Sequence, residues 1–242
     1  SKDRDIKIWS IVNGQYQQIE IRGFHSHYVI SVEVLDDGRI LSGDDYGYVK
    51  IHANSSKSIT LFQDSSAESL VRLNIHQVVM GFGDGCINIY NLTDNTTNWQ
   101  KHGTKITHIG RINDTHFMSS SLNNRSLYIW EANTGTIVNQ IDLGEGKYSR
   151  CSIYLKANLI ATSISDKIIR IYDLTTGLIL KTFSGHTELV THLEFVSTLN
   201  VLLSLSTESL KLWLINENLE SSILINQISY TSLATSMILL CK

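Results

Sequence analysis

The stretch Leu159–His186, LIATSISDKIIRIYDLTTGLILKTFSGH, contains three short apolar runs, two polar turns between them and a Gly-His pair at its end. The turns are Ser-Asp-Lys at 165–167 and Thr-Thr-Gly at 175–177. Apolar or alternating runs of four to eight residues, rich in β-branched side chains and bounded by such turn residues, are typical of β-strands. The stretch therefore predicts three consecutive antiparallel strands joined by short turns.

The second of these runs recurs along the chain as a short strand that ends in an aromatic residue or a histidine. Successive ends are 43, 38, 40, 42 and 41 residues apart, at Trp9, His52, Tyr90, Trp130, Tyr172 and Trp213. Six recurrences at so constant a spacing indicate an internal repeat of about 40 residues. No window has a sustained period of 3.6 residues, so the sequence predicts an all-β chain with essentially no helix.

Each repeat contains further strand-like runs at constant offsets. A short apolar run precedes the aromatic-ended strand, as RILSG does at 39–43, and a turn rich in Asn, Thr or Gly with another extended run follows it. Four strands per repeat, together with Gly185-His186 four residues before Val190, resemble the WD-repeat family of β-propellers. The resemblance covers the whole chain and implies a single domain, residues 1–242, made of four-stranded antiparallel blades.

In the resembled family a histidine before the first strand, a Ser or Thr of the second, an Asp in the next turn and the aromatic residue of the third form a buried hydrogen-bond network. The Asp of this pattern is found at Asp84 and Asp166, whereas Tyr46 and Asn124 occupy its place in two other repeats. No repeat has all four members, so we expect an eroded network and a greater reliance on apolar packing, with the repeat-phase tryptophans in the core. The resemblance assigns this structural signature to Trp9, Trp130, Trp213, Tyr90, Tyr172, Asp84, Asp166, His25, His102 and His186.

The two ends of the chain lie in phase across whole repeats. Joining the C-terminal MILLCK to the N-terminal SKDRDIKIW gives a segment that aligns without a gap with His116–Trp130. Because a propeller must join its last blade to its first to leave no open sheet edges, this phase predicts six blades. The closing blade would combine about 228–242 with about 5–21. A fragment of a seven-bladed or longer array is the alternative.

Composition excludes several classes of function. Hydrophobic residues make up 42% and charged residues 18% of the chain, with a net charge of −3, as in a soluble globular protein. Scattered Lys and Arg form no basic stripe for nucleic acid, and no apolar run approaches the roughly 20 residues that span a membrane. The three cysteines, Cys86, Cys151 and Cys241, lack a CxxC spacing. With no secretory signal at the N-terminus, we expect an intracellular protein, cytoplasmic or nuclear.

The sequence contains no pattern of a catalytic or metal centre. The pairs His102/His108 and His186/His192 fall at the same phase of two repeats, which favours structural roles, and no HExxH or GxSxG motif is present. We therefore expect no enzyme, no catalytic residue, no metal and no cofactor. A hydrolase or lactonase of the propeller type, with acids and a metal in its channel, is one alternative. A regulatory, ligand-sensing segment of a larger multidomain protein is another.

The informative side chains are those that do not repeat. In the resembled family, residues near the starts of first strands and in the turns between second and third strands emerge on one face around the channel. Aromatic and arginine side chains are enriched at binding hot spots, so this face is predicted to bind other proteins or peptides. Trp99, which lies out of phase, is either an exposed contact or a filler of the blade edge. The predicted binding residues are His27, Tyr28, Tyr46, Lys105, Arg125, Lys147, Tyr148, Arg150 and Glu188.

The predicted function is thus that of a non-catalytic scaffold for protein interactions. Arg125 and Arg150 carry guanidinium groups that would bind an acidic or phosphorylated peptide through paired hydrogen bonds. No nucleic acid or membrane is expected among the partners, and the sequence does not indicate an oligomeric state.

Overall fold

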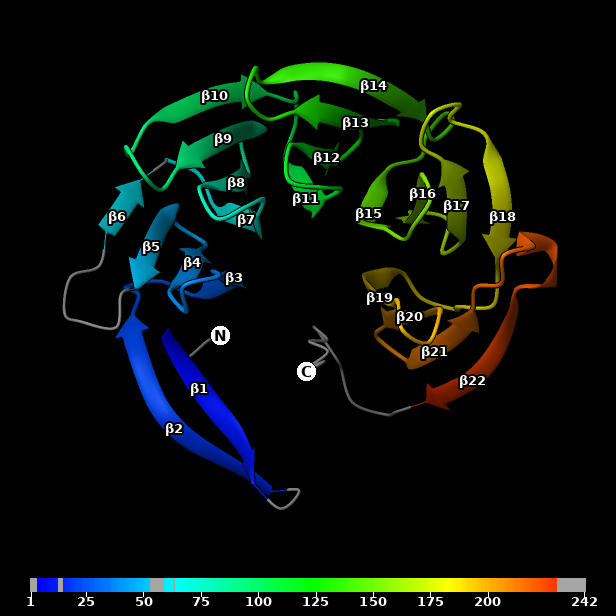
Figure 1. Ribbon diagram of the computed structural model, residues 1–242, viewed down its shortest axis with the longest axis horizontal. Helices are drawn as coiled ribbons and strands as arrows, with labels where there is room; N and C mark the ends of the chain where they lie inside the picture. The colour runs from blue at the N-terminus through cyan, green and yellow to red at the C-terminus, as the bar shows by residue number, and fades with distance from the viewer. Residues whose placement is uncertain (1–3, 13–14, 53–58, 63, 230–242) are drawn as a thin grey trace. The chain divides into compact units, whose positions relative to one another are not determined.

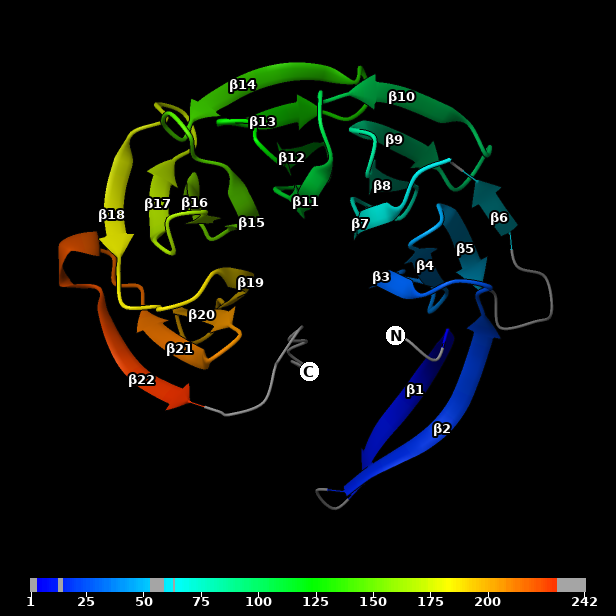
Figure 2. The same cartoon turned by 180° about the vertical axis from the view of Figure 1, so that it is seen from behind.

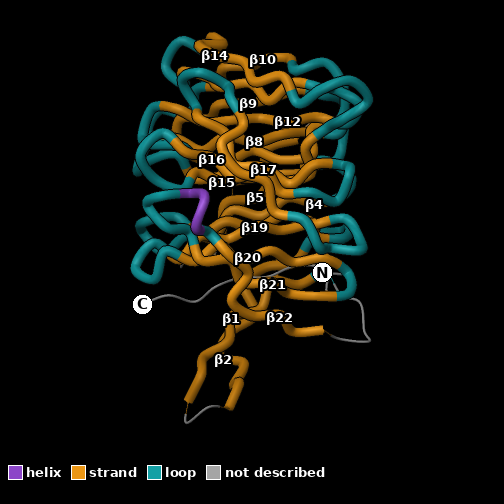
Figure 3. The backbone as a smooth tube through the Cα atoms, turned by 90° about the vertical axis from the view of Figure 1, so that its right-hand side faces the viewer, coloured by secondary structure: helices purple, strands orange, loops and turns teal. Residues whose placement is uncertain are grey.

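The computed structural model describes residues 4–12, 15–52, 59–62 and 64–229. Contacts divide the chain into two compact units, unit 1 at residues 1–106 and unit 2 at residues 107–242. The helical content of the described residues is one 3-10 turn, η1 (Leu219–Ser221), drawn in purple in Figure 3. None of these residues forms a helix long and apolar enough to cross a membrane. The prediction of an all-β chain is confirmed.

Unit 1 contains a two-stranded sheet followed by two four-stranded antiparallel sheets, blades A and B, in which sequential strands are neighbours (Figure 1). The two-stranded sheet consists of β1 (Asp5–Val12) and β2 (Gln15–Phe24). Blade A consists of β3 (Val29–Val34), β4 (Ile40–Asp44), β5 (Tyr48–His52) and β6 (Ile59–Phe62). Blade B consists of β7 (Ala67–Arg72), β8 (Gln77–Phe82), β9 (Cys86–Asn91) and β10 (Thr97–Lys101).

Unit 2 contains three more four-stranded antiparallel sheets, blades C, D and E, in the same strand order (Figure 2). Blade C consists of β11 (Ile106–Arg111), β12 (His116–Ser121), β13 (Ser126–Glu131) and β14 (Thr136–Asp142). Blade D consists of β15 (Ser149–Tyr154), β16 (Leu159–Ile164), β17 (Ile169–Asp173) and β18 (Ile179–Phe183). Blade E consists of β19 (Val190–Val196), β20 (Val201–Ser206), β21 (Ser209–Leu214) and β22 (Ile223–Ser229).

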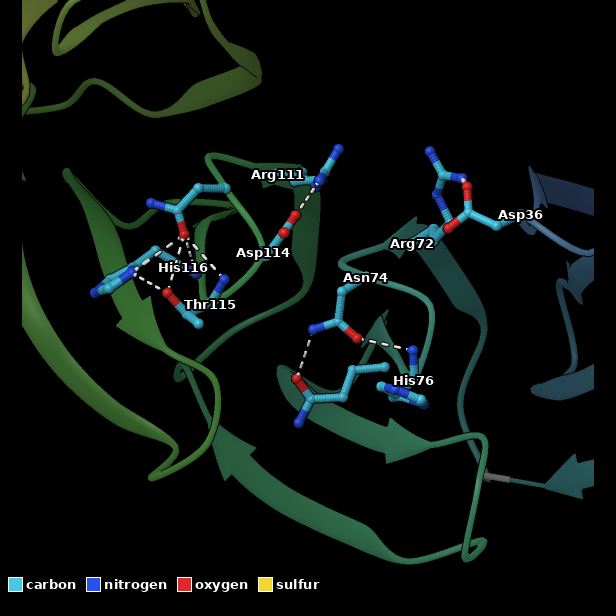
Figure 4. Close-up of polar contacts among 10 residues, drawn as sticks. Asp36, Arg72, Asn74, His76, Arg111, Asp114, Thr115 and His116 are labelled. Carbon is cyan, nitrogen blue, oxygen red and sulfur yellow. Dashed lines mark hydrogen bonds and ion pairs between the residues drawn. The ribbon is translucent and has the colours of Figure 1, made fainter.

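Asparagine side chains close the turns between the first and second strands. In blade B the side-chain oxygen of Asn74 accepts the N–H of His76 at 2.8 Å (Figure 4). In blade C the side chain of Asn113 accepts the N–H groups of Thr115 and His116, both at 2.9 Å. Asn favours turns because its side chain can accept such a bond from backbone two residues ahead. The turns are therefore specified locally by the sequence.

Within each unit the core lies between neighbouring blades, where one face of a sheet packs on the next. In unit 1, Leu41 and Ile51 of blade A share a buried cluster with Met80 and Tyr90 of blade B. In unit 2, Trp213 of blade E belongs to a cluster with residues of blade D. Complete burial of one large apolar side chain stabilises a fold by roughly 1.5–3 kcal/mol. Trp130, Trp213, Tyr90 and Tyr172 are all buried as the repeat predicts.

Trp9 departs from this pattern, since its exposed fraction is 52%. The physical reason is that β2 is the only strand that pairs with β1 in the described part of the chain. Trp99 is 43% exposed and its ring lies 5.7 Å from that of Phe82, so it both covers the blade edge and faces solvent. The predicted closing blade falls largely on residues 230–242, outside the described residues. Ile228 belongs to β22.

A repeated hydrogen bond joins consecutive blades. The acceptor is the backbone carbonyl of the residue that begins the first strand of one blade. The donor is a side-chain hydroxyl of the blade before it. In unit 1 the hydroxyl of Ser31 donates to the carbonyl of Ala67 at 2.7 Å. In unit 2 the hydroxyl of Thr107 donates to Ser149 at 2.8 Å. These bonds give hydrogen-bond partners to the carbonyls of two residues that are completely buried.

Substitution of Gly43 by alanine is expected to lower the free energy of unfolding by about 1–3 kcal/mol. A Cβ at this position would lie 2.6 Å from the Cβ of Ala67 and 2.7 Å from the hydroxyl of Ser31, so blades A and B would have to separate. Urea denaturation of the purified chain measures the loss. Adding Ala67→Gly should restore part of it, because the closest contact is then removed. A double variant no more stable than Gly43→Ala alone would contradict this packing.

Candidate functional site

Two loops at one end of blade A are joined by backbone contacts. The N–H of Tyr28, just before β3, donates to the carboxylate Oδ1 of Asp45 at 2.9 Å, and the N–H of Asp45 donates to the carbonyl of Tyr28 at 3.0 Å. Asp45 belongs to the turn between β4 and β5. The two loops are therefore fixed against each other, although they are about 17 residues apart in the chain.

The joined loops carry four aromatic side chains, which we call the aromatic cluster: His27, Tyr28, Tyr46 and Tyr48. The His27 and Tyr46 rings stack with centroids 4.4 Å apart and planes within 12°. The Tyr48 ring is 6.1 Å from Tyr46 and nearly parallel to it. Tyr28 and Tyr46 are 47% and 52% exposed. The guanidinium of Arg4 lies 6.0 Å from the centroid of the Tyr28 ring.

Buried Asp44 holds the turn that carries Tyr46 and Tyr48. Its Oδ1 accepts the backbone N–H groups of Tyr46 at 3.0 Å, Gly47 at 2.9 Å and Tyr48 at 2.9 Å. Its Oδ2 lies 2.9 Å from Nδ1 of His25. Both side chains are fully shielded from solvent. The carboxylate thus fixes the backbone of the turn, and the aromatic side chains of that turn remain outside.

The buried network of blade A corrects one expectation from the sequence. Tyr46 does not replace the network carboxylate, because Asp44, two residues earlier, supplies it. Nε2 of His25 lies 2.7 Å from the hydroxyl of Ser42, and that hydroxyl lies 2.8 Å from Nε2 of His52. His52 therefore takes the place of the family's tryptophan. Burial lowers the pKa of His25, and the hydrogen bond to Asp44 opposes this shift.

Blade E has a related network without a carboxylate. The indole N–H of Trp213 donates to the hydroxyl of Ser204 at 2.8 Å, and that hydroxyl lies 2.7 Å from Nε2 of His186. The hydroxyl of Ser209 lies 3.3 Å from Nδ1 of the same histidine. Burial lowers the pKa of His186 to about 4, with a smaller contribution from the charge of Lys211. In blade C, the indole N–H of Trp130 donates to Ser119 at 2.7 Å.

The two carboxylates that fit the repeat pattern lie outside these networks. Asp84 is exposed and accepts the N–H of Cys86 at 3.0 Å. Asp166 pairs with Arg170 at 2.6 Å and with Lys147 at 3.2 Å. Asp166 therefore orders a predicted binding residue, Lys147, instead of a buried histidine. His102 is buried, as the pattern predicts, and its backbone N–H donates to the carbonyl of Gly85 at 2.9 Å.

The remaining predicted binding residues are distributed over both units. In unit 1, Lys105 pairs with Glu68 at 2.7 Å. In unit 2, Arg125 forms an exposed pair with Asp142 at 3.5 Å, and Glu188 pairs with Lys167 at 3.6 Å. The structure brings His27, Tyr28 and Tyr46 together in unit 1. Sequence reasoning missed Tyr48, whose signal is its spacing of two residues from Tyr46 at the start of a strand.

Tyr148 and Arg150 lie at the start of β15 in unit 2. The carbonyl of Tyr148 accepts the N–H of Ser165 at 3.0 Å. Arg150 is half-buried, and its charge lowers the pKa of His192 on β19, an effect smaller than that of burial. Burial also lowers the pKa of His108 on β11 to about 4. The imidazole of His108 is therefore neutral at pH 7, and the charge of Arg150 acts on the imidazole of His192.

The structure gives little support for chemistry at these positions. Asp44, His25 and Ser42 have the connectivity of a hydrolase triad, but Ser42 is completely buried, so no substrate can reach its hydroxyl in the folded protein. Burial raises the pKa of Cys151 to about 12, which keeps its sulfur a thiol. Among the described residues no group of three or more His, Cys, Asp or Glu side chains has the arrangement of a metal site.

No protein-family model matches the chain, and no curated protein matches it in sequence. Its fold is nevertheless similar to solved structures. One is the crystal structure of RRP9 WD40 repeats and another is the structure of U3-55K, each with a TM-score of 0.82 and 14% sequence identity. The alignments cover 97% of this chain and 77% and 78% of those chains. The chain therefore has the fold of WD40-repeat proteins, a β-propeller fold built from four-stranded antiparallel blades.

Proposed function

We propose that this protein is a non-catalytic scaffold that binds proteins or peptides through its loops, with the aromatic cluster of unit 1 as the main anchor. The observation that carries the proposal is the exposure of Tyr28 and Tyr46, each about half accessible, on loops that the carboxylates of Asp45 and Asp44 hold in place. Tyrosines supply a large contact area with few rotatable bonds, and they are enriched among the residues that dominate binding energy.

The rigidity of the loops supports a role in binding. Ordering a mobile loop costs free energy when a partner binds, and a loop that is already ordered avoids this cost. Three backbone N–H groups of the turn around Tyr46 donate to Asp44, and the loop before β3 is tied to this turn through Asp45. The cluster is therefore preorganised for a partner.

The charged loop residues would contact the partner around the aromatic anchor. Lys105, Lys147 and Glu188 each form an ion pair within their own unit, so their contribution is to orientation and association rate more than to affinity. Arg125 is held by Asp142. Arg150, for which the described residues show no ion pair, is the better candidate in unit 2 for an acidic or phosphorylated peptide.

The proposal predicts that Tyr46→Ala and Tyr28→Ala, together, remove most protein partners that the intact chain captures. The tagged chain is incubated with extract of its own cells, and recovered proteins are quantified by mass spectrometry. The turn bonds to Asp44 use the backbone of Tyr46, so the substitutions leave the turn intact. Ile137→Thr, on an exposed outer strand of unit 2, is the control. Recovery equal to that of the unsubstituted chain would contradict the proposal.

A further inference from the structure

We infer that the aromatic cluster takes an arginine side chain of the partner, with the guanidinium stacked on the Tyr46 ring and paired with the carboxylate of Asp45. This inference rests on the proposed function and assigns a chemical class to the partner segment. It also predicts a partner that is basic at this contact, whereas the arginines of unit 2 suit an acidic one.

The first support is the state of the Asp45 carboxylate. Its Oδ1 accepts the N–H of Tyr28 at 2.9 Å, and among the described residues its Oδ2 has no donor and the side chain forms no ion pair. Asp45 is exposed and adjoins Tyr46 in the chain. Carboxylates beside the other predicted loop residues already have cations of this chain as partners, namely Glu68 with Lys105, Asp166 with Lys147 and Asp142 with Arg125. Asp45 therefore offers an exposed negative charge that the folded loops do not neutralise.

The second support is the geometry of the rings. His27, Tyr46 and Tyr48 present nearly parallel planes, within 10° to 19° of one another. A guanidinium is planar and weakly hydrated, so it stacks on such a face, whereas an ammonium is a compact and strongly hydrated charge. The arrangement of a flat aromatic face beside a carboxylate therefore favours arginine over lysine.

The third support is a guanidinium already present at the cluster. Arg4 of this chain lies over the face of Tyr28, 6.0 Å from its centroid. Its carbonyl accepts the N–H of His25 at 2.9 Å, which fixes the backbone at that point. The chain thus places one of its own arginines on one ring of the cluster. By the inference, the Tyr46 ring, on the side away from His27, and the neighbouring Asp45 take an arginine from outside.

The test uses the full chain and three matched peptides, Ac-Gly-Ser-X-Ser-Gly-amide, in which X is arginine, lysine or citrulline. Citrulline has the planar shape of arginine without its charge, so it separates stacking from ion pairing. Affinities are measured by titration followed by NMR. We expect the arginine peptide to bind at least about tenfold more tightly than either of the others. The citrulline peptide loses the paired charge-assisted bond, and the lysine peptide loses the stacking.

Variants of the chain assign the effect to Asp45. Asp45→Asn retains an oxygen that can accept the Tyr28 N–H, yet it removes the charge, and it should weaken arginine-peptide binding about tenfold. The control is Asp94→Asn in blade B, where an exposed turn carboxylate accepts the N–H of Thr96 at 2.9 Å in the same manner. This control should leave the affinity unchanged.

Three results would overturn the inference: equal affinities for arginine and citrulline, an unchanged affinity in Asp45→Asn, or a loss of the same size in Asp94→Asn. The proposed function fails separately, through unchanged partner recovery by the Tyr28 and Tyr46 double variant. Lost partners with no arginine-peptide binding would keep the scaffold function and reject arginine as its ligand.

Discussion

Replacement of Asp44 by alanine should lower the free energy of unfolding by roughly 3–5 kcal/mol, the largest loss expected from any single carboxylate of the described chain. The substitution removes the carboxylate that accepts the N–H groups of Tyr46, Gly47 and Tyr48 and that partners Nδ1 of His25, while the N–H of Gly47 keeps its second acceptor, the backbone carbonyl of residue 44, at 3.3 Å. The side chains of Asp44 and His25 are both fully shielded from solvent. Unsatisfied buried donors carry their full desolvation cost, which is why the effect is large.

The matched control for this prediction is Asp84→Ala. Asp84 fits the sequence pattern of the network carboxylate, yet it is exposed, and it accepts the backbone N–H of Cys86. Its removal should cost less than about 1 kcal/mol. Urea denaturation of both variants, followed by circular dichroism, measures the difference. Equal losses in the two variants would show that Asp44 does not hold the turn as the structure indicates.

Acidification from pH 6.5 to pH 4 should destabilise the protein through His108 and His186. Burial lowers the pKa of each imidazole from 6.5 to about 4 in the folded chain. Below pH 6.5 the unfolded chain therefore binds protons that the folded chain does not, and stability falls until the pH reaches the folded pKa. Each pKa unit corresponds to 1.36 kcal/mol, so each histidine contributes a loss of up to about 3 kcal/mol over this range.

Glutamine variants isolate this contribution. In His186→Gln the amide can still accept the Ser204 hydroxyl, and in His108→Gln it can still donate to the carbonyl of Ser152, which lies 2.9 Å from Nε2 of His108. Neither amide titrates, so the loss of stability between pH 6.5 and 4 should become smaller by about 3 kcal/mol per substitution. Burial raises the pKa of Glu194, which opposes the histidines in the unsubstituted chain. The test is the free energy of unfolding from urea denaturation at several pH values. The same dependence on pH in a variant and in the unsubstituted chain would refute the contribution of that histidine.

The strands and blades could be predicted from sequence because they depend on local pattern and on a repeat. Trp130, Trp213, Tyr90 and Tyr172 occupy the same position of the repeat. Each of them is buried, because the same position of each blade has the same surroundings. Trp9 shares the phase but not the burial, since burial requires neighbouring strands as well as register.

The site could be predicted only in part, because it depends on contacts between loops. The non-repeating positions of His27, Tyr28 and Tyr46 were visible in the sequence. The structure stacks His27 on Tyr46 and ties the backbone of Tyr28 to Asp45, the residue before Tyr46. The role of Asp44 was not visible in the sequence. Asp84 and Asp166 lie six residues before the aromatic residue of the following strand, and the same spacing before His52 leads to Tyr46 instead. The pairing of Lys147 with Asp166 joins two loops of blade D, and no residue pattern specifies that contact.

The central claim is that buried repeat residues maintain the scaffold while exposed loop residues bind the partner. Parallel measurement of the melting temperature and of partner recovery in Tyr46→Ala tests it most directly. Tyr46 is 52% exposed and its turn is held through backbone bonds, so the melting temperature should stay within about 2 °C of the parent value while partner recovery falls severalfold. Full recovery of partners, or a loss that is accompanied by a large drop in melting temperature, would contradict the claim.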